Sequence, residues 1–194
     1  MSGSRFGLSK RQYELIGKVA AEWATLEWML QCGVWDIAGM DPGTGMKITS
    51  DLRSPVIFNM LLALAHDSDK DERSQPPIYW AFYNIGPTLV ELRGERNRIV
   101  HQDWLRQSQS EIVGFHHEAK GKLKAKIITR NVSDMEGTIS RIRNLTAKVV
   151  EILEHHKHGQ LVASPPTPPK RPQAGPRTRN TGLALGRPHR PSEK

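Results

Sequence analysis

The sequence contains a single cysteine and no long apolar run. Cys32 is the only cysteine among 194 residues, so no disulfide can form within the chain. The longest mostly apolar stretch, residues 56–65, is interrupted by Asn59 and is far shorter than the ~20 residues that span a bilayer. The first ten residues, MSGSRFGLSK, lack the apolar segment of a secretory signal. These absences predict a cytoplasmic protein with no membrane contact.

Most of the net charge of +8 lies near the C-terminal end. Residues 161–194 contain seven Lys or Arg and one acid, Glu193, and therefore carry +6. The other 160 residues hold 21 basic and 19 acidic side chains, a net charge of only +2. The Pro-rich composition buries too little apolar surface to offset the entropy of ordering, which predicts a disordered basic tail over residues 160–194.

Two long stretches carry apolar residues three or four positions apart, the spacing that lines one face of a helix. The first helix is predicted to begin after an N-cap at Ser9 and to end near Ala38. Its apolar face comprises Tyr13, Ile16, Val19, Trp23, Leu26 and Leu30. The last helix is predicted to be capped by Ser133 or Asp134 and to end near His155. Its apolar stripe comprises Met135, Ile139, Ile142, Leu145, Val149 and Ile152.

Between these stretches, Gly and Pro residues indicate the element boundaries. Residues 39–50 are predicted to form a loop, and a second helix is expected over residues 55–66. A third helix is expected to begin at the prolines 76–77, because proline is tolerated in the first turn. Gly86 and Pro87 are predicted to kink or break this helix, and a fourth helix restarts at Pro87.

Residues 111–132 have a different composition. Val113 and Phe115 precede a Lys-Gly-Lys turn, and Ile127 and Ile128 follow it, which is typical of a β-hairpin. The predicted fold is therefore all-α: a bundle of four to five helices over residues 1–159, with a small β-hairpin inserted before the last helix.

The stretch RGERNRIVHQDW, residues 93–104, combines cations, an amide and an imidazole. If residues 91–104 are helical, a step of 100° per residue places six side chains within roughly 140° around the axis. These are Arg93, Arg96, Asn97, Val100, His101 and Trp104. A core stripe rarely carries two arginines and a histidine, and a solvated face rarely carries Val and Trp. The stripe is therefore the candidate functional surface.

Residues 96–101, Arg-Asn-Arg-Ile-Val-His, resemble the Arg-polar-three-residues-His motif of HEPN domains (higher eukaryotes and prokaryotes nucleotide-binding). The residue after the Arg is often Asn in that family, as it is here. In architecture, the resemblance extends over residues 9–155. It implies a helical bundle with the motif on a late helix, and a metal-independent ribonuclease that uses no cofactor.

The resemblance assigns roles that elementary chemistry supports. Cleavage by the 2′-OH of RNA needs a base, an acid for the leaving 5′ oxygen, and a cation for the phosphorane. An imidazole such as that of His101 transfers protons near neutral pH, and the Arg96 fork can hold phosphate. Asn97 would orient these groups, and Arg93 and Trp104 are the candidate binding residues. No metal site is expected.

One histidine cannot easily serve as acid and base in one step, so this interpretation requires a homodimer with two facing motifs. Val100 and Trp104 are expected near the two-fold contact. The expected substrate is RNA rather than DNA, in a toxin or phage-defence setting with an antitoxin or regulatory protein as partner. One toxin branch has a Tyr two residues after the His. Asp103 stands there in this chain, which argues against a tyrosine-modifying antitoxin.

Two alternatives involve no catalysis. In the first, Arg96 pairs with Glu95 or Glu91, and His101 is a hydrogen-bonded interior histidine with a structural role. In the second, the chain is a HEPN-like module that binds a nucleotide, RNA or a protein without cutting it.

Overall fold

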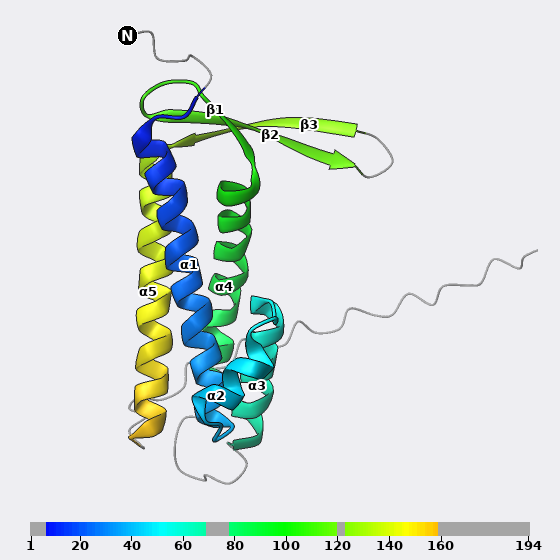
Figure 1. Ribbon diagram of the computed structural model, residues 1–194, viewed down its shortest axis with the longest axis vertical. Helices are drawn as coiled ribbons and strands as arrows, with labels where there is room; N and C mark the ends of the chain where they lie inside the picture. The colour runs from blue at the N-terminus through cyan, green and yellow to red at the C-terminus, as the bar shows by residue number, and fades with distance from the viewer. Residues whose placement is uncertain (1–6, 69–77, 120–122, 159–194) are drawn as a thin grey trace, which may run out of the picture.

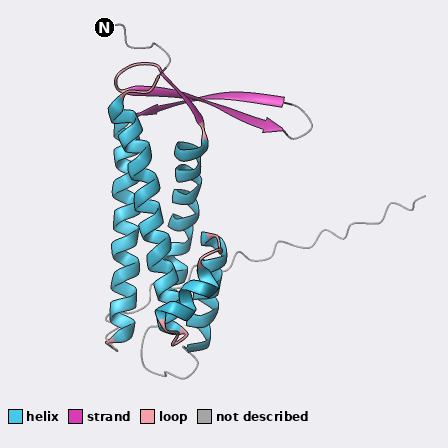
Figure 2. Ribbon diagram, in the orientation of Figure 1, coloured by secondary structure: helices cyan, strands magenta, loops and turns pink. Residues whose placement is uncertain are grey.

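The computed structural model describes residues 7–68, 78–119 and 123–158 (Figure 1). Within these ranges the helices stand side by side, and a small sheet lies across one end of the bundle (Figures 1 and 2). The helices are α1 Lys10–Ile37, α2 Pro42–Thr49, α3 Ser54–Ser68, α4 Ile78–His101 and α5 Val132–Lys157. The strands are β1 Asp103–Arg106, β2 Glu111–Ala119 and β3 Leu123–Asn131. The predicted helical bundle with an inserted hairpin is therefore confirmed.

The start of α1 follows the sequence prediction. Ser9 Oγ accepts a hydrogen bond from Gln12 N, and Gln12 Oε1 accepts one from Ser9 N at 2.8 Å. This reciprocal cap satisfies two backbone donors that the helix cannot pair itself. The assignment of Tyr13 to the buried face is wrong, because Tyr13 is 60% exposed and Leu15 is buried instead.

The core lies between α1, α3, α4 and α5. The apolar stripe predicted for α5 is confirmed, since all six of its residues are buried: Met135, Ile139, Ile142, Leu145, Val149 and Ile152. The cap of α5 differs in detail from the prediction. Asn131 is the N-cap residue, and Asp134 accepts a hydrogen bond from Asn131 N at 3.0 Å. Each fully buried aliphatic side chain contributes roughly 1.5–3 kcal/mol to stability.

The loop predicted over residues 39–50 is wrong, because α2 forms there. Asp41 caps this helix through a hydrogen bond from Thr44 N at 3.0 Å, and Pro42 occupies the first helical position. The helix packs on Trp35, whose Nε1 donates to Thr49 Oγ1 at 3.1 Å. Local caps and one tertiary contact thus order a segment whose Gly content suggested a loop.

The sequence predicts a kink or break at Gly86 and Pro87, with a fourth helix restarting at Pro87. The break and the restart are wrong, since α4 continues through Pro87. A proline inside a helix costs about 3 kcal/mol because it removes a backbone hydrogen bond. The buried residues Ile85 and Leu89 anchor α4 on either side of this point. Gly86 lies close to Phe58 of α3, which a Cβ would meet at 3.3 Å. The expected start at residues 76–77 lies outside the described residues.

The hairpin is confirmed as β2 and β3, which pair antiparallel with Ile112 opposite Arg130. Strand β1 was not predicted. It pairs antiparallel with β2 and places Trp104 opposite Gly114. Helix α4 therefore ends at His101 rather than continuing through Trp104. The Trp104 indole caps this end of the helix. Its Nε1 donates to the carbonyl of Ile99 at 2.7 Å and so satisfies an acceptor at the helix end.

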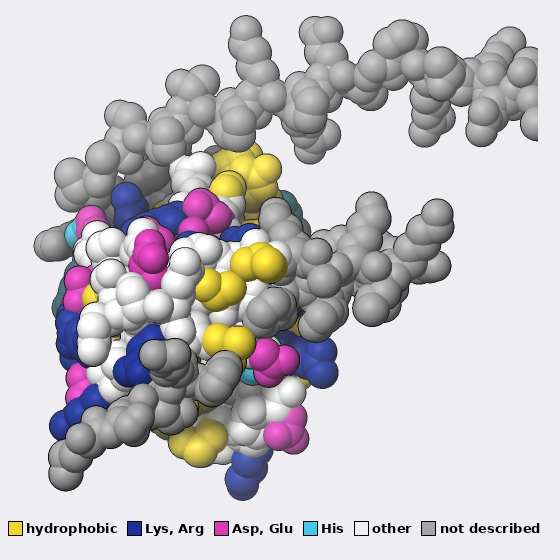
Figure 3. Space-filling model, turned by 90° about the horizontal axis from the view of Figure 1, so that it is seen from above, with side chains coloured by type: hydrophobic (Ala, Val, Ile, Leu, Met, Phe, Trp, Pro, Cys, Tyr) yellow, Lys and Arg dark blue, Asp and Glu magenta, His cyan; other side chains and the backbone are white. Residues whose placement is uncertain are grey.

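In the described helices, no segment has the length and apolarity that crossing a membrane would require. The tail predicted to be disordered, residues 160–194, lies outside the described residues. Seen from above, the end of the molecule that carries the sheet shows Lys, Arg, Asp and Glu side chains interspersed among the described residues (Figure 3). This mixture agrees with the small net charge counted for the body of the chain.

Candidate functional site

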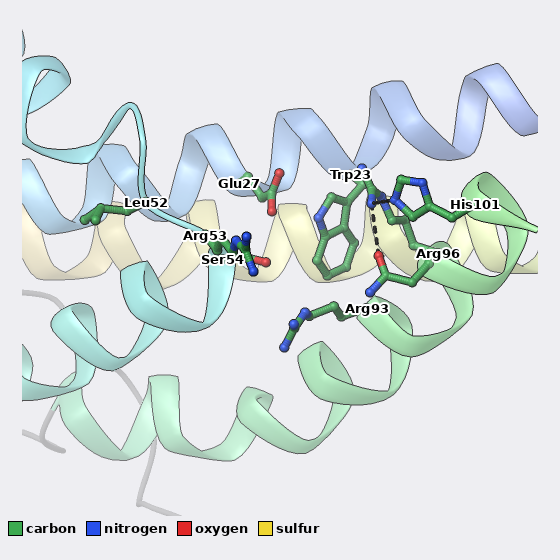
Figure 4. Close-up of a pocket in the computed structure, with 9 residues that line it drawn as sticks. Trp23, Glu27, Leu52, Arg53, Ser54, Arg93, Arg96 and His101 are labelled. Atoms are coloured by element: carbon green, nitrogen blue, oxygen red, sulfur yellow. Dashed lines mark hydrogen bonds between the residues drawn. The ribbon is translucent and has the colours of Figure 1, made fainter. Parts of the chain in front are cut away.

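A cleft of about 490 Å³ opens beside the last turns of α4 (Figure 4). Helix α1 forms one wall, α4 forms another, and the connection from α2 to α3 closes one end. The cleft is lined by Trp23, Glu27, Leu52, Arg53, Ser54, Arg93, Arg96, Asn97 and His101. Trp23 is only 2% exposed, so it belongs to the core beneath the cleft.

Arg96 connects the other two motif residues. Its Nη1 donates to Asn97 Oδ1 at 3.0 Å and lies 2.9 Å from His101 Nε2 (Figure 4). A guanidinium N–H can only donate, so the second contact is a hydrogen bond when Nε2 carries no proton. The three residues that the sequence singled out for chemistry thus form one hydrogen-bonded group.

The position of this group follows from how α4 is held. Ile99 and Leu92 are fully buried and fix the rotation of the helix about its axis. Arg96 and Asn97 are consequently half-buried at the edge of the core, and His101 is exposed at the helix end. The hydrogen bond from Trp104 to the Ile99 carbonyl holds the last turn of α4 in place.

The acids next to the motif are paired with another residue. Arg141 of α5 binds Glu91 at 2.8 Å and Glu95 at 3.2 Å, and Thr138 Oγ1 also donates to Glu95. The hydrogen bond to Glu91 raises the pKa of the Arg141 guanidinium. The structural alternative, in which Arg96 pairs with Glu95 or Glu91, is therefore wrong.

Arg96 also has an unsatisfied donor. Its Nε is buried without a hydrogen-bond partner, and no other buried side-chain nitrogen or oxygen of the described residues is in that state. Leaving such a donor unpaired costs roughly 1–3 kcal/mol. The fold therefore keeps the guanidinium in a position where one of its N–H donors has no partner among the described residues. The second part of the structural alternative is also wrong, because His101 is exposed rather than interior.

Three arginines face the cleft without a carboxylate partner. Neither Arg53, Arg93 nor Arg96 forms an ion pair within the part of the chain that the structure describes. Glu27 is the single acid among the described lining residues. The cleft therefore has a local excess of positive charge that the near-neutral composition of the body conceals.

The structure brings together four of the five residues that the sequence proposed. Arg93, Arg96, Asn97 and His101 line the cleft. Trp104 does not line it, because it lies on β1 and packs, half-buried, against the core. Its indole instead contacts the end of α4 through the hydrogen bond to the Ile99 carbonyl.

Sequence analysis missed four lining residues: Glu27, Leu52, Arg53 and Ser54. They are separated from the motif by about forty residues or more, and no local pattern links them to it. Among the described residues, no group of three or more His, Cys, Asp or Glu side chains is placed to hold a metal ion. The histidines after residue 154 lie at the end of α5, where His158 is 3.9 Å from Glu154.

Comparisons with protein-family models, with curated proteins and with solved structures found no match to this chain.

Proposed function

We propose that this chain is a metal-independent endoribonuclease of the HEPN type, acting as a homodimer. The observation that carries the proposal is the group formed by Arg96, Asn97 and His101 on the wall of an electropositive cleft. The resemblance of residues 96–101 to the HEPN motif supplies the reaction class. The motif residues keep their side chains free of carboxylates, as a phosphate-binding role requires.

The proposed reaction is an internal transfer at phosphorus. The 2′ oxygen attacks the adjacent phosphorus while one imidazole takes its proton, and the bond to the 5′ oxygen breaks. A second proton donor protonates the leaving 5′ oxygen, so the products are a 2′,3′-cyclic phosphate and a 5′-hydroxyl end. DNA lacks the 2′-OH and cannot react in this way, so RNA is the proposed substrate.

Arg96 has two roles in this scheme. In the free protein its Nη1 faces Nε2 of His101, which keeps a lone pair on that nitrogen. When a phosphate enters, the guanidinium can turn its fork to the phosphate oxygens and stabilise the charge that develops there. Once the guanidinium has turned away from Nε2, this nitrogen of His101 can accept the proton of the 2′-OH. Asn97 holds the guanidinium in place during this exchange.

The second proton-transfer group is proposed to come from a second copy of the chain. Tyr83, Val90 and His101 lie on one stripe of α4, because they are separated by about two and three helical turns. Val90 is 68% exposed and Tyr83 is 42% exposed, so both are accessible to a second copy of the chain. A dimer through this stripe would bring two copies of His101 toward each other. Val100, expected near the contact, instead packs half-buried against its own core.

The test is cleavage of a single-stranded RNA in the presence of EDTA. Wild type should cut the RNA and leave cyclic phosphate ends. His101→Ala and Arg96→Ala should each lower the rate by at least about a hundredfold, the usual range for one acid–base group. Arg98→Ala is the matched control, because Arg98 is exposed on the same turn but does not line the cleft. Unchanged cleavage by His101→Ala would falsify the mechanism.

A HEPN-like module that binds RNA without cutting it is the second candidate. It is favoured by the fact that His101 is the single imidazole among the described residues that line the cleft. If the protein remains a monomer at the concentration of the assay and binds RNA without cutting it, this candidate replaces the first. A toxin or phage-defence setting, with an antitoxin or regulatory partner, remains part of the proposal for the enzyme.

A further inference from the structure

The end of the cleft away from His101 is formed by the start of α3. Leu52, Arg53 and Ser54 line the cleft there, and Ser54 is the first residue of this fifteen-residue helix. The N-terminus of a helix carries a partial positive charge. In α3 this charge acts without free N–H donors at residues 55–57, because Pro55 has no N–H and the N–H groups of Val56 and Ile57 donate to the carbonyl of Arg53. Figure 4 shows Arg53 and Ser54 on one side of the cleft, with Arg93 between them and the motif residues.

Ser54 is an unpartnered polar side chain at this helix start. It is only 5% exposed, yet its hydroxyl forms no hydrogen bond with any residue that the structure describes. Because it is not among the fully buried unsatisfied atoms, this hydroxyl reaches the open space of the cleft, where it can donate to a ligand or water. A hydroxyl beside a helix N-terminus donates well to an anion.

The charges around this position also favour an anion. Arg53 directly precedes α3, and its guanidinium has no carboxylate partner in the described chain. Arg93 of α4 also lines the cleft, and its guanidinium likewise has no carboxylate partner among the described residues. Glu27 of α1 is the opposing charge. Two arginines and a helix N-terminus outweigh one carboxylate, so the position is net positive.

We propose that Arg53, Ser54 and Arg93 form a second phosphate subsite, separate from the one at Arg96 and His101. It binds a backbone phosphate of single-stranded RNA at a nucleotide next to the scissile linkage. The inference rests on the proposed function in one respect: it takes the Arg96–His101 end as the position of cleavage. The protein would then hold a polynucleotide through at least two phosphates and would select against mononucleotides.

Binding tests the subsite independently of cleavage. The probe is a fluorescent single-stranded RNA of ten nucleotides with 2′-O-methyl groups, which cannot undergo 2′-OH attack. Arg53→Ala should weaken binding on the order of tenfold, as expected for loss of a charged hydrogen bond. It should also reduce the slope of log affinity against log salt by about 0.7, the contribution of one phosphate contact on a single strand.

Matched variants separate the subsite from general charge effects. Lys148→Ala removes one exposed cation from α5, outside the cleft, and should leave affinity and salt slope nearly unchanged. Ser54→Ala removes the hydroxyl without changing charge, so it should weaken binding while leaving the salt slope the same. Arg53 is exposed, so its replacement is not expected to disturb the fold. Circular dichroism melts check this for each variant.

A series of cleavable substrates tests the position of the subsite. In wild type, adding one nucleotide to a dinucleotide substrate, on the side that reaches the subsite, should raise kcat/KM. Arg53→Ala should abolish that gain. Competition by millimolar inorganic phosphate should be weaker in Arg53→Ala than in wild type.

The outcomes for the two proposals are distinct. If wild type binds the 2′-O-methyl RNA but cuts no RNA, the proposed enzyme fails, and the binding data still decide on the subsite. If Arg53→Ala and Ser54→Ala match wild type in affinity and salt slope, the subsite is refuted, whether or not the protein cuts RNA. If both variants and Lys148→Ala weaken binding equally, the effect is non-specific charge and the subsite is also refuted.

Discussion

The guanidinium of Arg96 lies 2.9 Å from Nε2 of His101, five residues further along the same helix. This contact places a permanent cation against the nitrogen that can accept a proton. Arg141 of α5 pairs with Glu91 and Glu95, and neither acid forms an ion pair with Arg96. The guanidinium of Arg96 therefore contacts Asn97 and His101 instead of a carboxylate.

The indole of Trp104 is expected to hold His101 in place. Trp104→Phe removes the donor to the Ile99 carbonyl and should lower the free energy of unfolding by about 1–2 kcal/mol. Because the last turn of α4 is then less restrained, RNA cleavage should also slow. Trp28→Phe on α1 is the control, since Trp28 is 41% exposed and does not line the cleft. Chemical denaturation and initial rates measure the two effects. Equal effects of the two substitutions would argue against the positioning role.

Val90 is expected to lie in the dimer contact. Val90→Glu should place two like charges at the two-fold axis and convert the protein to a monomer without RNA cleavage. Its melting temperature should change little, because Val90 is 68% exposed within one chain. Val150→Glu on α5 is the matched control and should remain dimeric. Sedimentation velocity distinguishes these states, and a wild type that is monomeric at assay concentrations would remove the composite site.

Glu27 is expected to oppose RNA binding. Glu27→Gln removes the one carboxylate among the described lining residues and should raise the affinity for single-stranded RNA by roughly threefold, at low salt most clearly. Glu14→Gln changes the same type of side chain on the exposed face of α1 and should have little effect. Fluorescence anisotropy at two salt concentrations provides the measurement. A loss of affinity in Glu27→Gln would show that this carboxylate assists binding instead.

Gly45 is expected to be required for packing between α2 and α1. A Cβ at this position would overlap the ring of Trp35, so Gly45→Ala should destabilise the protein by about 1–3 kcal/mol. Gly17→Ala is the contrasting variant, because nothing lies near the added Cβ in the middle of α1. It should stabilise the protein by about 0.5–1 kcal/mol through helix propensity. Thermal melts compare the two, and destabilisation by Gly17→Ala alone would contradict the packing account.

The sequence by itself determined the elements whose signal is local and repeated. Apolar residues at helical spacing predicted α1 and α5, and Ser9 as an N-cap predicted where α1 begins. Alternation around a Gly-containing turn predicted β2 and β3. The motif predicted that Arg96, Asn97 and His101 act together, because their spacing on one helix fixes them near one another.

Only the tertiary structure decided features that depend on distant partners. Packing of α2 on Trp35 and anchoring of α4 across Pro87 overrode local Gly and Pro signals. Pairing with β2 ended α4 at His101 and moved Trp104 onto a strand. Sequence periodicity reports which face of an element is buried. It carries no information on which side chains of other elements will meet that face. For this reason the capture of Glu91 and Glu95 by Arg141, and the arrival of Glu27, Arg53 and Ser54 at the cleft, could be known only from the fold.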